Sequence, residues 1–191
     1  MNKIRSAAFA ALAALALTLP MVAQAAQVQL SVVTEPGVIR PGETSVVTVL
    51  AGYSGTDLLL GGAFSLDFDA RLLEVVDVRL DAPRDIAGTI GLVETVGDIG
   101  TIAGVGFASF SGMGGTFEFA AITFRALGPS GVSSLTAIDA DDPIYAWASE
   151  SLQPVTVFGA TNLISVVPEP ASMLMLPLGL GVIGLSIRRR R

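Results

Sequence analysis

The chain has 191 residues, with 17 acidic residues against 11 Lys and Arg and no Cys or His. The lack of Cys and His excludes disulfides, thiolate nucleophiles, Cys or His metal sites and His-based catalytic triads. Between residues 26 and 167, 5 arginines and 16 acidic residues give a net charge of −11. Such a surface repels nucleic acid, so no nucleic-acid partner is expected.

The first 25 residues have the three parts of a secretory signal. A basic start is followed by apolar residues 7–19 and then by small residues that end at Ala25. We therefore predict that residues 1–25 are a signal peptide with a short apolar helix. An uncleaved membrane helix would need a longer apolar run. The mature chain is expected to begin at Ala26.

Residues 26–165 show the pattern of an all-β domain. In residues 64–69, Phe64, Leu66 and Phe68 alternate with polar residues, which predicts a strand with one core face and one solvent face. Apolar residues nowhere keep a helical period for three turns. About nine short strands are expected, at residues 27–32, 44–50, 64–68, 74–80, 89–95, 102–110, 116–127, 131–138 and 155–166. Together they predict a two-sheet sandwich of jelly-roll or immunoglobulin-like type.

Two local irregularities are also expected. Residues 52–62 are interpreted as a loop. Within residues 116–127 the apolar parity changes near Ala120-Ala121, which predicts a β-bulge there. The glycines near residues 104–115 fit hairpin and bulge positions that need a positive φ.

Residues 62–74, Gly-Ala-Phe-Ser-Leu-Asp-Phe-Asp-Ala-Arg-Leu-Leu-Glu, resemble the cohesin family. They repeat its alternating strand, Asp-led turn and Leu-Leu-Glu continuation, although Ala70 stands where Pro is commoner. Residues 122–126 and the later Gly131 are similar to the late strand and hairpin of that family. The resemblance implies a cohesin-like jelly roll and a dockerin-like protein module as a possible partner.

The C-terminus combines a Pro-Glu-Pro motif, an apolar run and a basic end. As a helix, residues 171–187 would span about 26 Å, just enough to cross a bilayer. The four terminal arginines would stay on the cytoplasmic side, so the preceding domain would face outward. The motif residues are Val167, Pro168, Glu169 and Pro170, and the basic end is Arg188, Arg189, Arg190 and Arg191.

Residues 166–191 therefore resemble the sorting tail of PEP-CTERM proteins. The resemblance implies that a membrane protease, the exosortase, recognises Pro-Glu-Pro and removes the tail from an inner-membrane precursor. It also implies a Gram-negative bacterium that makes exopolysaccharide. The alternative is an ordinary single-span anchor after a Pro-rich linker.

Asp67 and Asp69 are candidates for carboxylate chemistry. Two residues apart on one strand, they share a face at about 6 to 7 Å, a spacing found in glycosidase acid–base pairs. A solvated strand face also needs polar residues at these positions. We favour the solvated face and keep a carboxylate-based glycosidase as the alternative.

A second candidate region follows at residues 139–147. Asp139, Asp141 and Asp142 could supply oxygen ligands to Ca²⁺, although a plain solvated turn has the same composition. Tyr145 and Trp147 could stack on sugar rings as a carbohydrate-binding module, or else cover the core of the sandwich. No other cofactor is expected.

The leading hypothesis is an exported, exosortase-processed protein without enzymatic activity. It would serve adhesion or assembly at the cell surface, in exopolysaccharide or biofilm. Its expected partners are exosortase and, in the matrix, either polysaccharide or a dockerin-like module. The carbohydrate-binding module and the glycosidase are the alternatives.

Overall fold

The computed structural model describes residues 25–82, 88–140 and 146–168, and all regular structure in these ranges is β-strand. The first strands are β1 (Gln27–Glu35), β2 (Val38–Ile39), β3 (Thr44–Ser54), β4 (Leu59–Asp69), β5 (Leu73–Leu80) and β6 (Thr89–Val96). The later strands are β7 (Ile99–Met113), β8 (Gly115–Ala126), β9 (Gly131–Asp139), β10 (Ala148–Ser149), β11 (Thr156–Phe158) and β12 (Ala160–Val166). β2 and β10 were not expected, and β11 is a part of the strand expected at residues 155–166. Each of these three strands has only two or three residues.

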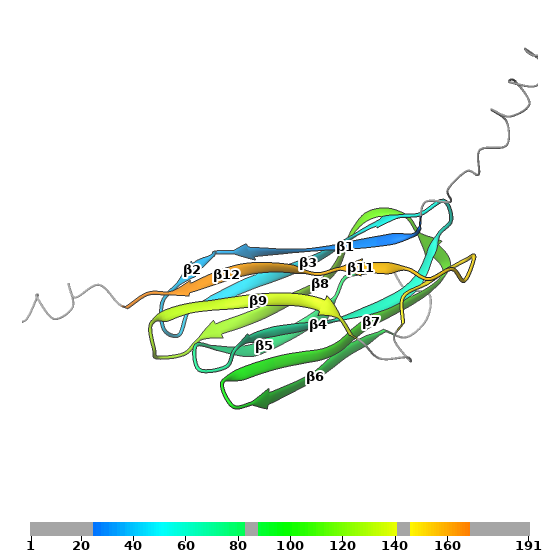
Figure 1. Cartoon of the computed structure of the whole chain (residues 1–191). Helices are drawn as coiled ribbons and strands as arrows, with labels where there is room; N and C mark the ends of the chain where they lie inside the picture. Colours follow the sequence, from blue (N-terminus) through cyan, green and yellow to red (C-terminus); the bar gives the residue numbers. More distant parts are fainter. Residues whose placement is uncertain (1–24, 83–87, 141–145, 169–191) are drawn as a thin grey trace, which may run out of the picture.

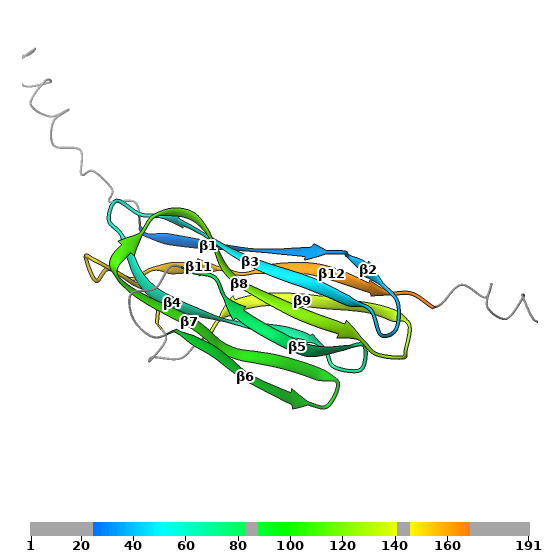
Figure 2. The same cartoon turned by 180° about the vertical axis from the view of Figure 1, so that it is seen from behind.

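The strands form two sheets that pack face to face (Figures 1 and 2). The five-stranded sheet has the order β11-β1-β3-β8-β5. The seven-stranded sheet has the order β2-β12-β9-β4-β7-β6, and the short β10 pairs with β4. The described chain starts at one end of the sandwich, and β12 finishes at the opposite end. The predicted two-sheet, all-β fold is confirmed.

The core follows the predicted alternation in β4. Phe64, Leu66 and Phe68 are buried between the sheets. The Phe64 ring meets the Phe119 ring edge-on with centroids 4.9 Å apart, and Phe68 meets Phe124 at 5.0 Å. If the alternation of inward and outward side chains were shifted by one residue, these rings would lie in solvent. Their burial therefore confirms the predicted register.

The loop predicted at residues 52–62 is too long, because only residues 55–58 lie outside the strands. β3 continues to Ser54 and β4 already begins at Leu59, so Gly61 and Gly62 lie in a strand. A Cβ at Gly62 would lie 2.2 Å from ring atoms of Trp147. The glycine therefore leaves room for an aromatic ring against a strand, a role that its sequence context does not distinguish from a loop.

The single strand predicted at residues 155–166 is also wrong. It divides at Gly159 into β11, which runs parallel to β1, and β12, which pairs antiparallel with β9. A Cβ at Gly159 would lie 2.6 Å from the carbonyl oxygen of Ala137. The missing side chain thus permits the close approach at which the chain changes sheets.

The predicted irregularities in β8 and β7 are present. Val49 pairs with Ala120 and Leu50 with Glu118, so Phe119 is the extra residue of a bulge next to the expected position. Gly104 and Gly112 have φ of 70° and 69°, a conformation that glycine adopts without steric cost. Both features keep long strands continuous while they bend around the core.

Candidate binding face

The outer face of the seven-stranded sheet carries a row of hydroxyl and carboxyl groups. Asp67 on β4 pairs with Thr101 on β7 and with Thr136 on β9. The Thr101 hydroxyl donates to Asp67 Oδ1 at 2.6 Å. The Thr136 hydroxyl lies 3.1 Å from that of Ser134 and 3.3 Å from that of Thr161. Side chains from β12, β9, β4 and β7 thus form one polar strip across the sheet.

At one end of this strip the surface is hollowed into a groove of about 370 Å³. Its polar walls include Asp67, Asp69, Arg71 and Asp98, and its apolar walls include Ile99 and Val132. Three carboxylates face one guanidinium, so the groove keeps an excess of negative charge. A partner group with a positive charge and an aliphatic stem would complement it.

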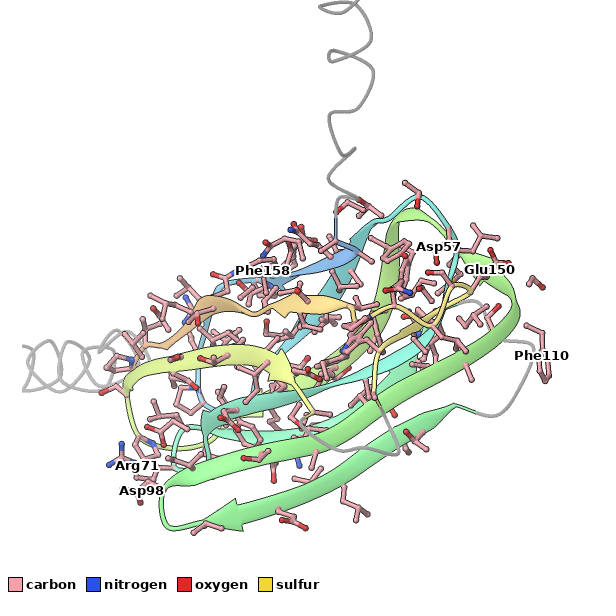
Figure 3. The ribbon with its side chains drawn as sticks, turned by 45° about the vertical axis from the view of Figure 1, so that its right-hand side comes forward. Asp57, Arg71, Asp98, Phe110, Glu150 and Phe158 are labelled. Carbon is pink, nitrogen blue, oxygen red and sulfur yellow. The ribbon has the colours of Figure 1, made fainter. Side chains whose placement is uncertain are left out.

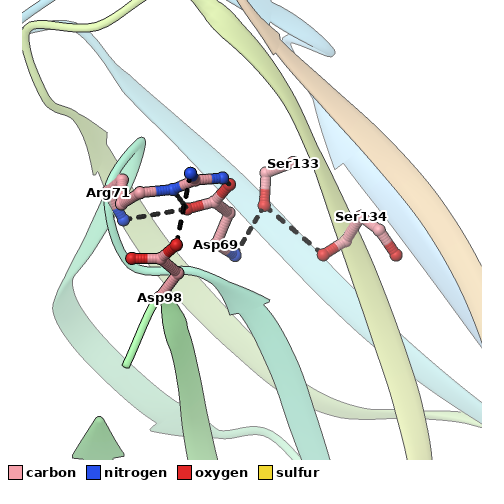
Figure 4. A network of polar contacts seen from close by, with 5 residues as sticks. All are labelled: Asp69, Arg71, Asp98, Ser133 and Ser134. Atoms are coloured by element: carbon pink, nitrogen blue, oxygen red, sulfur yellow. Dashed lines mark hydrogen bonds and ion pairs between the residues drawn. The ribbon is translucent and has the colours of Figure 1, made fainter. Parts of the chain in front are cut away.

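A network of ion pairs fixes the groove (Figure 4). Arg71 Nη2 lies 2.7 Å from Asp69 Oδ2, and Arg71 Nη1 lies 3.2 Å from Asp98 Oδ2. The backbone N–H of Asp69 donates to the Ser133 hydroxyl at 3.0 Å. The contacts join the β4–β5 turn to the β6–β7 turn and to β9.

The network changes the acid–base properties of Asp69. Hydrogen bonds from the Arg71 side chain hold the pKa of the Asp69 carboxyl below its usual range. The same interaction raises the pKa of Arg71. A glycosidase general acid requires the opposite direction, a raised pKa. Asp67 and Asp69 do share the predicted solvent face of β4. Asp69, however, forms an ion pair with Arg71 that holds the β4–β5 turn.

Exposed aliphatic side chains surround the polar strip. Val132 and Ile138 on β9, Leu163 on β12 and Ile99 on β7 are more than 40% exposed. Exposed apolar patches mark protein interaction sites, and these side chains lack the aromatic rings on which sugars stack. We call this surface, from Leu163 across to Ile99, the outer face.

Trp147 is buried and is not placed for sugar stacking. Its side chain is only 7% exposed, and its ring lies edge-on to Phe119 at 5.7 Å and to Phe107 at 6.4 Å. The core role that the sequence left open for Trp147 is the one observed. Its predicted companion Tyr145 lies outside the described residues.

Of the predicted Ca²⁺ ligands, only Asp139 is described, at the exposed end of β9. Asp141 and Asp142 lie outside the described residues. Within residues 25–82, 88–140 and 146–168, no three acidic side chains come together as a metal site. The Ca²⁺ site remains a prediction.

A second polar cluster lies at the far end of the sandwich. Asp57 accepts hydrogen bonds from the Tyr53 hydroxyl at 2.6 Å and from the Ser151 backbone N–H at 2.9 Å. Glu150 accepts one from the backbone N–H of Leu58 at 3.3 Å. In Figure 3, Asp57 and Glu150 lie together at this end, away from Arg71 and Asp98. The cluster ties two loops to each other.

Arg71, Asp98 and Ser134 were not among the predicted site residues. Arg71 follows Asp69 by two residues in a turn, and that spacing alone could have indicated the first ion pair. Asp98 is 27 residues from Arg71 along the chain. Only the pairing of β4 with β7 brings the two together.

Several solved structures are similar to the sandwich. A cohesin module from a Clostridium perfringens family 33 glycoside hydrolase is 5% identical, with a TM-score of 0.56, and the match covers 74% of this chain and 98% of that one. The cohesin CaCohA2 of Clostridium acetobutylicum is 21% identical, with a TM-score of 0.48 and coverage of 74% and 91%. The seventh ScaB type I cohesin of Pseudobacteroides cellulosolvens is 16% identical, with a TM-score of 0.49 and coverage of 76% and 94%. A search of curated proteins found no match. The fold is cohesin-like.

The tail is recognised separately. Residues 166–191 match the family model of the PEP-CTERM protein-sorting motif. The motif marks the chain as an exported, membrane-anchored precursor that exosortase processes. It begins at the last residue of β12, and the backbone N–H of Val167 still donates to the carbonyl oxygen of Ile39 at 2.9 Å. The sandwich therefore leads directly into the sorting tail.

Most of the sorting tail, including Glu169, Pro170 and Arg188 to Arg191, lies outside the described residues. The predicted span at residues 171–187 and the signal peptide lie outside them too. In the ranges that are described, no helix is long and apolar enough to cross a membrane.

Proposed function

We propose that the mature protein is a binding module that works without enzymatic turnover in the cell envelope or extracellular matrix of a Gram-negative bacterium. Exosortase removes its tail, and the outer face then docks a partner protein in the exopolysaccharide or biofilm matrix. A dockerin-like module is one candidate for this partner. The observation that carries the proposal is the acidic groove beside exposed aliphatic side chains on one flat sheet.

The geometry favours a protein over a glycan as the direct partner. The exposed side chains around the groove are aliphatic, and Trp147 is committed to the core. Figure 3 places two exposed aromatic residues, Phe110 and Phe158, away from Arg71 and Asp98 at the groove. Proteins commonly recognise a sugar ring by stacking an aromatic side chain against it. Because the outer face offers aliphatic side chains instead, it fits a protein partner better than a glycan.

The sorting step can be tested on the tail itself. Replacing Pro168, Glu169 and Pro170 with alanine leaves the apolar span and its arginines intact but removes the proposed recognition motif. We expect the variant to stay in the inner membrane, while the wild-type protein is released with its N-terminus at Ala26. Mass spectrometry of both fractions measures this. Surface-released protein that keeps its arginine tail would contradict exosortase processing.

Docking can be tested with matched substitutions on the two outer surfaces of the sandwich. Val132→Lys changes a groove residue that is 58% exposed, and Val46→Lys changes a valine that is 42% exposed on the five-stranded sheet. We expect Val132→Lys to lower retention in the native matrix at least about tenfold, because it fills the groove with a fixed charge, and Val46→Lys to leave retention near wild type. The measurement is the fraction of tail-processed protein that remains with the matrix.

Two outcomes would favour other functions. Equal retention of wild type and both variants, with release of all three by a chelator, would indicate divalent cations that bridge acidic surfaces to a polysaccharide. Hydrolysis of matrix polysaccharide that is lost in an Asp67→Asn, Asp69→Asn double variant would indicate a glycosidase.

A further inference from the structure

The four borders of the two sheets differ in how well they are protected against pairing with another strand. Strands at sheet edges carry unpaired N–H and C=O groups, and monomeric proteins block them with short strands or charged residues. β11 and β2 have only three and two residues. β5 carries Glu74, Asp77 and Arg79 among its eight residues. Three of the four borders therefore have a recognised form of protection.

β6 has neither form. It is eight residues long, and Glu94 is its only charged residue. Ile90, Leu92, Val93 and Val96 are each more than half exposed. Within the described residues, β6 pairs with β7 on one side only, and Figures 1 and 2 show it as the free border of the seven-stranded sheet.

We propose that β6 pairs antiparallel with β6 of a second copy of this chain, which joins two seven-stranded sheets across a twofold axis. An identical strand supplies the same length and the same aliphatic side chains, so one edge is its own complement. The pairing would bury exposed Leu92, Val93 and Val96 from both copies and satisfy main-chain groups along both edges.

Charge disfavours one register of this pairing. Centred on Glu94, the two strands would place like charges directly opposite each other, which is destabilising. Centred on Val93, they place Val93 opposite Val93 and Glu94 opposite Leu92 of the second copy. The second register avoids direct opposition of the only charged pair.

The twofold pairing has a consequence for binding. A twofold axis perpendicular to the sheet keeps both outer faces on the same side of the joined sheet. Each dimer would then present two grooves to one surface, so that a partner with repeated sites would be held by avidity. The dimer itself rests on β6 and would remain even if the outer face bound nothing.

The lack of native Cys makes the register directly testable by cross-linking. Residues directly opposite in an antiparallel pair have Cα atoms about 4.5 to 5.5 Å apart, within the range that a disulfide spans. In the full chain, after export and mild oxidation, Val93→Cys should form disulfide-linked dimers. Val76→Cys on the charged edge β5 is the matched control, since Val93 is 52% and Val76 49% exposed.

We expect cross-linking through residue 93 to exceed that through residue 76 at least about tenfold, and tail-processed wild type to sediment as a dimer. Val93→Lys should weaken the dimer at least about tenfold, because it puts a charge on the edge, and Val76→Lys should not. Added salt should strengthen the dimer by screening the −11 charge of each domain. Wild-type protein that stays monomeric at a concentration of about 100 µM, near the weak end of specific interfaces, would overturn the proposal. Equal cross-linking through residues 93 and 76 would overturn it too.

Discussion

Tyr53 shows how one buried polar side chain couples stability to pH. Burial is the main cause that raises its pKa to about 12, and the hydrogen bond to Asp57 and the negative charge of that carboxylate add to it. In an unfolded chain the phenol titrates near pH 10. Because the folded pKa is the higher one, folding favours the protonated phenol, and its contribution is complete below about pH 10.

We therefore expect stability to fall as the pH rises from about 10 to about 12, through the interval between the unfolded and folded pKa values of Tyr53. Tyr53→Phe should remove this part of the fall, because the variant has no proton to lose there. Urea unfolding midpoints across the interval measure the effect. The chain has two tyrosines, so absorbance titration of a Tyr145→Phe variant isolates Tyr53. A phenol that ionises near pH 10 in that variant would contradict the prediction.

Among the strands, β4 includes two glycines, Gly61 and Gly62, in a segment whose pattern predicts a loop. Gly62 faces the Trp147 ring, and Trp147 packs on Phe107 and Phe119. Because Gly62 has no side chain, the Trp147 ring can rest directly on the strand at this position. This packing joins the segment around β10 to the core of the sandwich.

Gly62→Ala should destabilise the fold by about 1 to 3 kcal/mol, because a Cβ 2.2 Å from the ring forces Trp147 to move. Gly128→Ala is the control, since a Cβ there meets nothing within 4 Å. Urea unfolding followed by the fluorescence of the single tryptophan measures both variants. Equal stability of the two would mean that the ring does not rest on Gly62.

At the scale of the whole molecule, the two ends of the sandwich have different surroundings before processing. β12 finishes at the end where Arg71 and Asp98 lie, and the sorting motif begins there (Figures 1 and 3). Asp57, Glu150 and Phe110 lie at the opposite end. The groove therefore lies at the end of the sandwich where the sorting motif begins.

We expect residues 26–167 to fold alone as β-structure, without the tail, a disulfide or a metal ion. The buried rings and aliphatic side chains of both sheets form one continuous core, each fully buried side chain contributing about 1.5 to 3 kcal/mol. Circular dichroism and thermal unfolding with and without a chelator measure this. A chelator that lowers the Tm by more than about 5 °C, roughly 1 kcal/mol for a domain of this size, would instead support Ca²⁺ at residues 139–142.

Features that depend on local pattern can be predicted from the order of the residues alone. The parity of residues 64–69 is visible in the chain because a strand alternates its side chains with period two. The bulge near Ala120 appears as a change in that parity, and the sorting tail as a fixed order of motif, apolar run and arginines. Each of these signals lies within one short stretch of residues.

Features that depend on which strands become neighbours are visible only in the folded sandwich. Arg71 meets Asp98 because β4 pairs with β7, and Trp147 enters the core because Gly62 leaves it space. The change of sheet at Gly159 and the free edge of β6 follow from the strand order. The physical reason is that strand pairing is set by burial summed over the entire sandwich, whereas the apolar alternation of a strand is the same whichever neighbour it takes.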